Sequence, residues 1–342
     1  MDVGVVGGSG YGGAELLRLL EQHPAFKVRV IAAGRAAGQT LSVVFPQLSG
    51  TSVAAHMLVE ATPDALSDCE IIFAATPHAV SLDLLPQLLR PERLLVDLSA
   101  AFRLPADDFE QWYGQVHSAG HLTPAVYGLP ELWRSDLLGV SLIAGPGCYP
   151  TAALLALGPV MALAGEGAIV VTGMSGWSGA GRGLRDDLHA SHTHDNVVAY
   201  GAPQHRHTPE IVGQLTRAGV TQPRVTFVPH LVPMARGMVV TCTLPLGDRV
   251  TADDVRQAVV DRYRNEPFVT VVEPGAWPAA TYVAGSNAAH VGVAVDERAE
   301  TIVTSCALDN LVKGAAGQAI QAANVATGTA ETAGLPIAGV YP

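Results

Sequence analysis

One cysteine and a pair of histidines have the residue types and surroundings that covalent catalysis requires. Cys148 follows the turn Gly145–Gly147 and precedes the apolar stretch "TAALLALGPVMAL", which predicts a helix. A helix N-terminus stabilises a thiolate, so this thiol is placed to act as a nucleophile. Such a nucleophile needs a proton partner, and "QHRHTPEIV" offers His205, His207 and Glu210. His207 and Glu210 are three residues apart and would share one face of a helix that begins between them.

The other cysteines and the densest group of histidines do not predict a metal site or a disulfide framework. Three cysteines lie in or beside strand-like runs, where buried thiols are usual: Cys69, Cys242 and Cys306. The four cysteines lie far apart and include no CxxC pair. The histidines of "DLHASHTHDN" are spaced i, i+3 and i+5, which does not place all three on one helix face: His189, His192 and His194. We therefore expect a surface cluster there and no metal in the protein.

A glycine-rich turn near the N-terminus predicts a nucleotide-phosphate site. Val3–Val6 reads as a strand and Ala14–Gln22 repeats leucines at helical spacing. Between them lie the glycines Gly7, Gly10 and Gly13 in a GxxGxxG arrangement, with Ser9 where the more familiar GxGxxG pattern has glycine. Glycine lets the backbone approach a pyrophosphate, and the N-terminus of the following helix favours its negative charge. We expect the turn, including Tyr11 at its end, to bind the cofactor.

The second predicted strand, Val28–Ala33, favours NADP over NAD. An NAD site usually has an acidic residue about 20 residues after the glycines, on the ribose 2′-hydroxyl. No acidic residue occurs from Val28 to Val59, and "AAGRAAG" instead places Arg35 just beyond the strand. A guanidinium at that position suits a 2′-phosphate. A solvated surface arginine is the alternative.

The order of the predicted elements indicates an α/β protein with two domains. Residues 1–147 contain short apolar runs that end in turn residues, typical of a doubly wound, Rossmann-type parallel sheet. From 148 to 313 strand-like segments dominate, which predicts an α+β domain with a largely antiparallel sheet. The last helical stretch is expected to pack back onto the first domain, which would add about 314–342 to the NADP-binding part.

Composition narrows the classes of partner. Of the 342 residues, 49% are hydrophobic, which is enough for a sizeable core. The net charge of −11 argues against nucleic acid, because phosphate-backbone binding needs clustered Lys and Arg. The start of the chain has no basic segment typical of a signal peptide, and the longest apolar run, Ala152–Gly165, is too short to span a membrane. We expect a soluble, cytoplasmic protein that acts on a small molecule, with no membrane partner.

Eight motifs, in order along almost the whole chain, resemble one enzyme family. They are "GGSGYGGAELLRLL", "DLSAAFRL", "YGLPEL", "GPGCYPTAALLAL", "SGWSGAGR", "HRHTPEI", "GSNAAHV" and "DNLVKGAAGQA". Together they look like N-acetyl-gamma-glutamyl-phosphate reductase, an arginine-biosynthesis relative of aspartate-semialdehyde dehydrogenase. The resemblance implies an oxidoreductase that uses NADP(H) and assembles as a homodimer or homotetramer.

The resemblance also implies a mechanism in which Cys148 attacks an acyl phosphate and expels phosphate to give a thioester. NADPH then reduces the thioester, and the aldehyde is released with a histidine handling the proton. His207 matches this acid–base residue better, while His205 and Glu210 would orient it or bind substrate. The choice between the two histidines stays open at this point.

Further positions follow from the same resemblance. The expected cofactor-binding residues outside the glycine turn and Arg35 are Pro77, Ser99, Ser178, Gly179 and Asn310, with Asp309 as a weaker candidate. The expected substrate-binding arginines are Arg103 and Arg236. The family commonly has aspartate where this chain has Ala101, so any role of that carboxylate is absent here.

Three alternatives differ in substrate or class. A related reductase would act on a glutamyl or aminoadipyl phosphate attached to a small acidic carrier protein, but those enzymes tend to read GCNAT where this chain has "GCYPT", with Tyr149 and Pro150. Aspartate-semialdehyde dehydrogenase differs around the cysteine and histidine motifs. A non-catalytic NADP-binding regulator would not need Cys148, His207 and Arg103 together.

Overall fold

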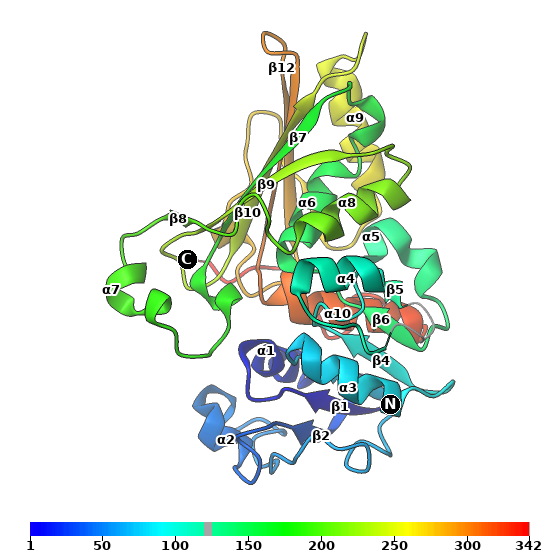
Figure 1. The fold of residues 1–342 in the computed structure, drawn as a ribbon, viewed down its shortest axis with the longest axis vertical. Helices are drawn as coiled ribbons and strands as arrows, with labels where there is room; N and C mark the ends of the chain where they lie inside the picture. The colour runs from blue at the N-terminus through cyan, green and yellow to red at the C-terminus, as the bar shows by residue number, and fades with distance from the viewer. Residues whose placement is uncertain (120–124, 342) are drawn as a thin grey trace. The chain divides into compact units, whose positions relative to one another are not determined.

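A computed structural model describes residues 1–119 and 125–341, and its chain divides into two compact units. Unit 1 comprises Met1–Gly147 and Ala315–Leu335, and unit 2 comprises Cys148–Gly314 and Pro336–Pro342. The combination of a parallel α/β sheet with a mixed α+β sheet confirms the predicted fold class. Figure 1 labels the elements of both units.

Unit 1 is built on a six-stranded sheet whose strand pairs are all parallel. Its strands are β1 (Asp2–Val6), β2 (Lys27–Ala32), β3 (Ile71–Ala74), β4 (Leu94–Asp97), β5 (Val126–Tyr127) and β6 (Leu142–Ala144). They lie in the order β2-β1-β3-β4-β6-β5. Every residue of β3 and β4 is buried, as expected for short apolar strands covered on both faces. The direction of winding reverses between β1 and β3, which is where doubly wound folds bind ligands.

The helices of unit 1 include one that returns from the far end of the chain. The list is α1 (Tyr11–Leu20), α2 (Leu41–Val44), α3 (His78–Leu88), α4 (Ala106–Tyr113), α5 (Pro130–Trp133) and α10 (Gly317–Ala326). Buried polar side chains fix α10: Gln318 donates to the Gly128 carbonyl at 2.8 Å, and Asn324 bonds to His23 at 2.9 Å. These bonds hold α10 within unit 1.

Unit 2 contains a seven-stranded sheet in the order β11-β12-β13-β10-β7-β9-β8. Its strands are β7 (Ala168–Ser175), β8 (Val198–Ala199), β9 (Arg224–Leu231), β10 (Met238–Pro245), β11 (Val269–Val271), β12 (Ala289–Asp296) and β13 (Thr301–Leu308). Four of the six strand pairs are antiparallel, whereas β7 with β9 and β11 with β12 are parallel. The sheet is thus largely antiparallel.

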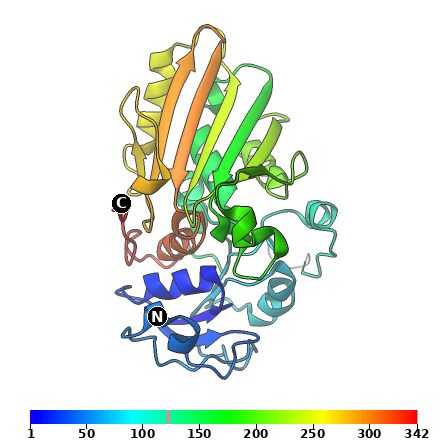
Figure 2. The ribbon, with the colours of Figure 1, turned by 90° about the vertical axis from the view of Figure 1, so that its left-hand side faces the viewer.

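Helices cover one face of that sheet. They are α6 (Cys148–Leu157), α8 (Thr208–Arg217) and α9 (Ala252–Tyr263), while α7 (Ala190–Thr193) lies in the loop before β8. In Figure 2 the strands of this sheet lie toward the viewer, with helices behind them. The strand β10 alternates buried and half-buried residues, so one side of each strand faces the helices and the other faces outward.

The structure differs from the predicted domain boundary at the C-terminal end. The residues after Leu335 belong to unit 2 because they bond to the segment just before β12: Asn287 N donates to Pro336 O and Val340 N to Ala284 O, both at 2.8 Å. The sequence pattern contained no periodic segment there that would have indicated this pairing. Pro342 lies outside the described residues, and none of the helices that the structure describes is long and apolar enough to cross a bilayer.

Candidate active site

The glycine turn between β1 and α1 is too tightly packed for other residues at two of its positions. Gly7 has φ +82°, and a Cβ atom there would lie 2.2 Å from the Ala75 carbonyl oxygen. A Cβ at Gly13 would lie 2.3 Å from the Gly7 carbonyl oxygen. Both clashes are with backbone, which cannot move aside cheaply. These glycines therefore let β1 and the start of α1 approach closely, as a phosphate-binding turn requires.

The N-terminus of α1 has the electrostatics of an anion site. Gly10 is its N-cap residue and supplies no side chain to the first turn, which also contains no acidic residue. Ser9 and Gly10 are half-buried and Tyr11 is exposed. Backbone N–H groups and the positive end of the helix dipole are thus presented beside the turn.

The other predicted cofactor residues of unit 1 lie at the carboxyl ends of neighbouring parallel strands. Arg35 is exposed in the loop after β2, Pro77 is exposed between β3 and α3, and Ser99 follows β4. Because β2, β1, β3 and β4 are adjacent in that order, the sheet brings these loops and the glycine turn to one edge. The donor set (tight glycines, a helix N-terminus and an exposed arginine) fits a phosphorylated dinucleotide.

A buried carboxylate that the sequence reasoning missed holds two of these loops. Asp97, at the end of β4, accepts hydrogen bonds from the hydroxyls of Ser81 (2.8 Å) and Ser99 (2.7 Å) and from the Ser99 N–H (3.1 Å). Burial raises the pKa of Asp97, and the hydrogen bonds from both serines partly oppose that rise. The Thr76 hydroxyl bonds to Ser81 at 2.9 Å, so the network reaches the loop after β3. The sequence signal that could have indicated this network is the aspartate at the end of the otherwise apolar strand β4.

Arg103, a residue predicted to bind the substrate, donates hydrogen bonds to unit 1 carbonyls from two of its nitrogens. Its Nε donates to the Gly145 carbonyl at 2.7 Å and its Nη2 to the Leu98 carbonyl at 2.8 Å. Gly145 N in turn donates to the Asp97 carbonyl at 2.7 Å. The guanidinium therefore fixes the loop after β4 and the turn that leads along the chain to Cys148.

In unit 2, Cys148 differs from the other cysteines in its exposure. It is the first residue of α6 and is half-buried, whereas Cys69, Cys242 and Cys306 are 3%, 0% and 0% exposed. Burial raises the pKa of Cys69, and it raises that of Cys242 to about 12. The thiols of Cys69 and Cys242 therefore stay protonated, and all three buried thiols are inaccessible to a substrate. Cys148 alone combines access with the N-terminus of a helix.

The predicted histidines lie beside the start of α6. The ring of Tyr149, the residue after Cys148, contacts the rings of His205 and His207 edge-on, with centroids 6.1 and 5.9 Å apart. His207 directly precedes α8. Glu210 is buried in the first turn of that helix, where a carboxylate interacts favourably with the positive end of the helix dipole. The fold thus brings together residues that are about 60 positions apart in the sequence.

The surroundings of His205 keep its ring neutral. His205 Nδ1 accepts the backbone N–H of His207 at 3.2 Å, which leaves the proton of the neutral ring on Nε2. Burial lowers the pKa of His205 to about 4, and the nearby charge of Arg206 adds to this effect. His205 is therefore neutral at pH 7 and poorly suited to exchange protons there.

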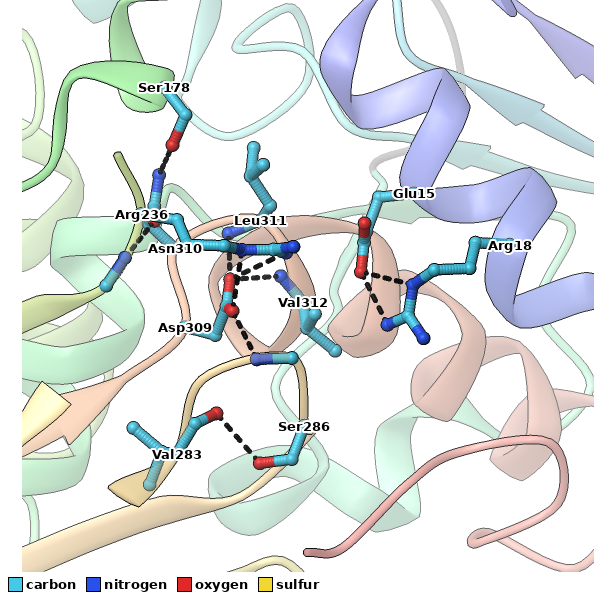
Figure 3. Close-up of polar contacts among 12 residues, drawn as sticks. Glu15, Arg18, Ser178, Arg236, Val283, Ser286, Asp309, Asn310, Leu311 and Val312 are labelled. Carbon is cyan, nitrogen blue, oxygen red and sulfur yellow. Dashed lines mark hydrogen bonds and ion pairs between the residues drawn. The ribbon is translucent and has the colours of Figure 1, made fainter. Parts of the chain in front are cut away.

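Figure 3 shows two further predicted residues of unit 2, Ser178 and Arg236, beside Asp309 and Asn310. The guanidinium of Arg236 pairs with the fully buried Asp309 carboxylate through Nε and Nη2, at 2.9 and 3.1 Å. Asn310 accepts from the Gly237 N–H at 2.7 Å and donates to the Ser178 hydroxyl at 3.0 Å. Gly179 lies close to the Asn310 amide.

The histidine cluster predicted to lie on the surface is exposed: His189, His192 and His194.

Comparisons with known proteins cover the whole chain. Residues 2–139 match the family model described as semialdehyde dehydrogenase, NAD binding domain, and residues 148–310 match the semialdehyde dehydrogenase, dimerisation domain. Proteins named N-acetyl-gamma-glutamyl-phosphate reductase are similar over 99% of both chains, at 42% identity for Desulforudis audaxviator and Symbiobacterium thermophilum and 40% for Desulfotalea psychrophila.

Solved structures share the fold at low sequence identity. Aspartate semialdehyde dehydrogenase II from Vibrio cholerae, complexed with ASA, superposes with a TM-score of 0.73 at 18% identity, covering 95% of this chain and 97% of that one. The Candida albicans aspartate semialdehyde dehydrogenase with NADP gives a TM-score of 0.67 at 18% identity and the same coverage.

The low pKa of His205 predicts a measurable pH dependence of stability. An unfolded histidine titrates near pH 6.5, so between pH 6.5 and about 4 the unfolded chain binds a proton that the folded chain excludes. Stability therefore falls as pH falls through this window, by at most about 3 kcal/mol for this residue. Replacing His205→Asn, which keeps an acceptor near the His207 N–H, should flatten the curve of unfolding free energy against pH.

Urea denaturation at a series of pH values measures this difference. His192→Asn changes an exposed histidine and should leave the wild-type pH dependence intact. Parallel curves for wild type and His205→Asn would show that His205 titrates normally in the folded protein.

Proposed function

Because the chain belongs to the N-acetyl-gamma-glutamyl-phosphate reductase family, we propose that it reduces N-acetyl-L-glutamyl 5-phosphate to the 5-semialdehyde in arginine biosynthesis, with NADPH as the reductant. The observation that carries the mechanism is the arrangement at the start of α6. There the accessible cysteine is followed by a tyrosine whose ring contacts both candidate acid–base histidines.

Cys148 is the proposed nucleophile. His207 takes the thiol proton, and the thiolate attacks the carbonyl carbon of the acyl phosphate. The C–O bond to phosphate breaks, leaving a thioester, and His207 returns the proton to the departing phosphate. Hydride addition to the thioester carbon would leave a thiohemiacetal oxyanion. Its C–S bond then breaks as the aldehyde carbonyl forms, and the thiolate is regenerated. Covalent capture divides a difficult displacement into two easier steps and holds the carbonyl in place.

NADP(H) is the proposed cofactor, and when bound it supplies the hydride for the second step. Gly7, Ser9, Gly10, Tyr11 and Gly13 would hold its pyrophosphate at the N-terminus of α1. Arg35 would pair with the 2′-phosphate, since it is exposed after β2 and no acidic residue lies between Val28 and Val59. Pro77, Ser99, Ser178, Gly179 and Asn310 complete the proposed set.

His207 is proposed as the acid–base residue because His205 already accepts a backbone hydrogen bond and has a lowered pKa. The ring of His205 is half-buried among aromatic side chains and accepts a backbone hydrogen bond through Nδ1. Glu210, buried in the first turn of α8, is proposed to orient His207 or bind substrate.

Two arginines are proposed to bind the negative groups of the substrate. Asp309 holds the guanidinium of Arg236 in one orientation, and the side chain is 32% exposed, which suits a carboxylate ligand. Arg103 is proposed to bind the phosphate, in addition to its bonds to the Gly145 and Leu98 carbonyls.

The free acetylated substrate is preferred over a carrier-linked one because of the sequence "GCYPT", which begins at Gly147. Tyr149 is 2% exposed, so its effect on that choice would be indirect.

The outward face of the unit 2 sheet is the proposed contact of a homodimer. Neighbouring positions on β7, β10 and β13 present apolar and hydroxyl side chains: Val170, Thr172, Met174, Val239, Thr241, Thr243 and Val303. Val170 and Met174 are 39% and 44% exposed. The matched description of residues 148–310 as a dimerisation domain supports this proposal. Two uncharged sheets can bury such faces against each other.

Replacing Cys148→Ser tests the nucleophile. With the semialdehyde, phosphate and NADP⁺, the rate of NADP⁺ reduction should fall by at least about 10³-fold, because an alkoxide is not formed near neutral pH as a thiolate is. Binding of NADPH should be retained. The matched variant Cys69→Ala changes a buried thiol and should keep most of the activity. Persistent phosphate-dependent turnover by Cys148→Ser would exclude the thioester mechanism.

Replacing Arg35→Ala tests the choice of cofactor. The dissociation constant of NADPH should rise by about 10-fold or more, since a charge-assisted hydrogen bond contributes about 1.5–3 kcal/mol. That of NADH, which has no 2′-phosphate, should change little. Arg29→Ala, in which an exposed arginine paired with Asp2 is lost, serves as the control. Equal weakening of both cofactors would remove the support for NADP selectivity at Arg35.

Replacing Thr241→Glu tests the proposed dimer contact. Thr241 lies between Thr172 and Ser305 in the sheet register, so a carboxylate there would be buried without a charge partner if the two faces met. Light scattering should show a monomer, whereas Thr221→Glu, in the exposed loop after α8, should keep the native mass. An unchanged mass for Thr241→Glu would place the contact elsewhere.

A further inference from the structure

Tyr149 occupies a distinctive place in unit 2. It is the second residue of α6, directly after Cys148, and its side chain is 2% exposed. In the first turn of α6 its ring points into the unit, where it meets the strands β7 and β9 and the loop before α8. The residue next to the proposed nucleophile is therefore part of the core that supports it.

The sheet provides a notch for the Tyr149 ring. A Cβ atom at Gly173, in the middle of β7, would lie 2.4 and 2.6 Å from two ring carbons of Tyr149. The ring of Phe227, on the neighbouring strand β9, contacts Tyr149 edge-on at 5.1 Å. Only glycine at position 173 allows the ring to lie this close to the strand. The position of the Tyr149 ring is thus determined by the backbone of β7 at Gly173 and by the ring of Phe227.

A hydrogen bond fixes the far end of the same side chain. The Tyr149 hydroxyl donates to the His230 carbonyl on β9 at 3.0 Å. Burial raises the pKa of Tyr149 well above its usual range, so the hydroxyl stays protonated and remains a donor. The side chain is held at its backbone, along its ring and at its tip.

Three rings then form a closed set of contacts. Tyr149 meets His205 at 6.1 Å and His207 at 5.9 Å, while His205 meets His207 at 4.9 Å. His205 also accepts the His207 backbone N–H. The imidazole of His207 is therefore supported by the Tyr149 ring on one side and by His205 on another. Movement of Tyr149 would change the position of His207 relative to the first residue of α6.

We propose that Tyr149 is a positioning residue: its ring, seated against Gly173, sets the imidazole of His207 in register with the Cys148 thiol. This inference rests on the roles of Cys148 and His207 under the proposed function. The ring carries the effect, and the hydroxyl contributes by anchoring it. The titratable and charged groups near the three rings include Cys148 on α6, Tyr200 and Arg206 before α8, Glu210 on α8 and His230 on β9.

The structure offers a matched control at the other end of α6. Tyr263, the last residue of α9, is also 2% exposed, and its hydroxyl donates to the Leu155 carbonyl of α6 at 2.6 Å. Tyr149→Leu and Tyr263→Leu each remove a buried ring and a hydrogen bond to a backbone carbonyl. Both should lower the melting temperature to a similar extent, which isolates the effect on chemistry from the effect on stability.

The readouts are kcat and the pH dependence of Cys148 alkylation by iodoacetamide, followed by mass spectrometry in the enzyme without substrate. In Tyr149→Leu, kcat should fall on the order of 10²-fold. Its alkylation profile should move toward that of His207→Asn, because the thiolate loses its imidazole partner. Tyr149→Phe keeps the ring and should restore the wild-type profile, with kcat within about 3-fold. Tyr263→Leu should keep both the profile and kcat.

A second pair of variants moves the ring without changing it. Gly173→Ala should displace Tyr149 and shift the alkylation profile in the same direction as Tyr149→Leu. Gly213→Ala, where a Cβ meets nothing within 4 Å, should leave the profile unchanged. This pair decides the question if Tyr149→Leu does not fold.

Failure of this proposal is distinguishable from failure of the proposed function. If Cys148→Ser is active, the nucleophile assignment itself is wrong. If Cys148→Ser is inactive but Tyr149→Leu and Gly173→Ala retain the wild-type alkylation profile, Tyr149 is a structural residue only. Equal loss in Tyr149→Phe and Tyr149→Leu would likewise overturn the role assigned to the ring.

Discussion

The first turn of α6 is packed between two glycines, and the proposed chemistry of unit 2 depends on that packing. Gly173 accepts the ring of Tyr149 from the sheet, and a Cβ at Gly314 would lie 2.8 Å from the Cβ of Cys148. A methyl group at either position would displace the helix start or the side chains it carries. Because interiors are close-packed, such a displacement is transmitted rather than absorbed. The position of Cys148 therefore depends on the lack of side chains at Gly173 and Gly314 as well as on its own contacts.

The same principle operates in unit 1, at the edge where the parallel strands end. The turn after β1 is closed by backbone-to-backbone packing at Gly7 and Gly13, which leaves N–H groups of the helix start facing outward. Asp97 fixes the neighbouring loops through serine hydroxyls instead. Its buried carboxylate is tolerated because each hydrogen bond offsets part of the desolvation cost. A pre-formed edge of this kind binds phosphates without first ordering its loops.

The sequence predicted those features that depend on local pattern. The strand–glycine–helix start and the fold class follow from periodicity and from residue types in short windows. The Asp97 network, the pairing of Arg236 with Asp309 and the docking of residues 336–341 on unit 2 did not follow, because each joins segments far apart in the chain. No local pattern encodes which carboxylate a given arginine meets. The roles assigned to individual site residues remain predictions.

The pairing of Arg236 with Asp309 shows why the cation proposed for the substrate lies on a buried acid. The Asp309 carboxylate also accepts the N–H groups of Gly285, Leu311 and Val312, at 2.6, 2.9 and 3.2 Å. These backbone bonds stabilise the buried charge, so Arg236 is not required to neutralise it alone. The guanidinium is held by two of its nitrogens yet keeps a partly exposed edge. An anion that meets this edge encounters a donor already oriented, and the entropy cost of ordering a long side chain has been met during folding.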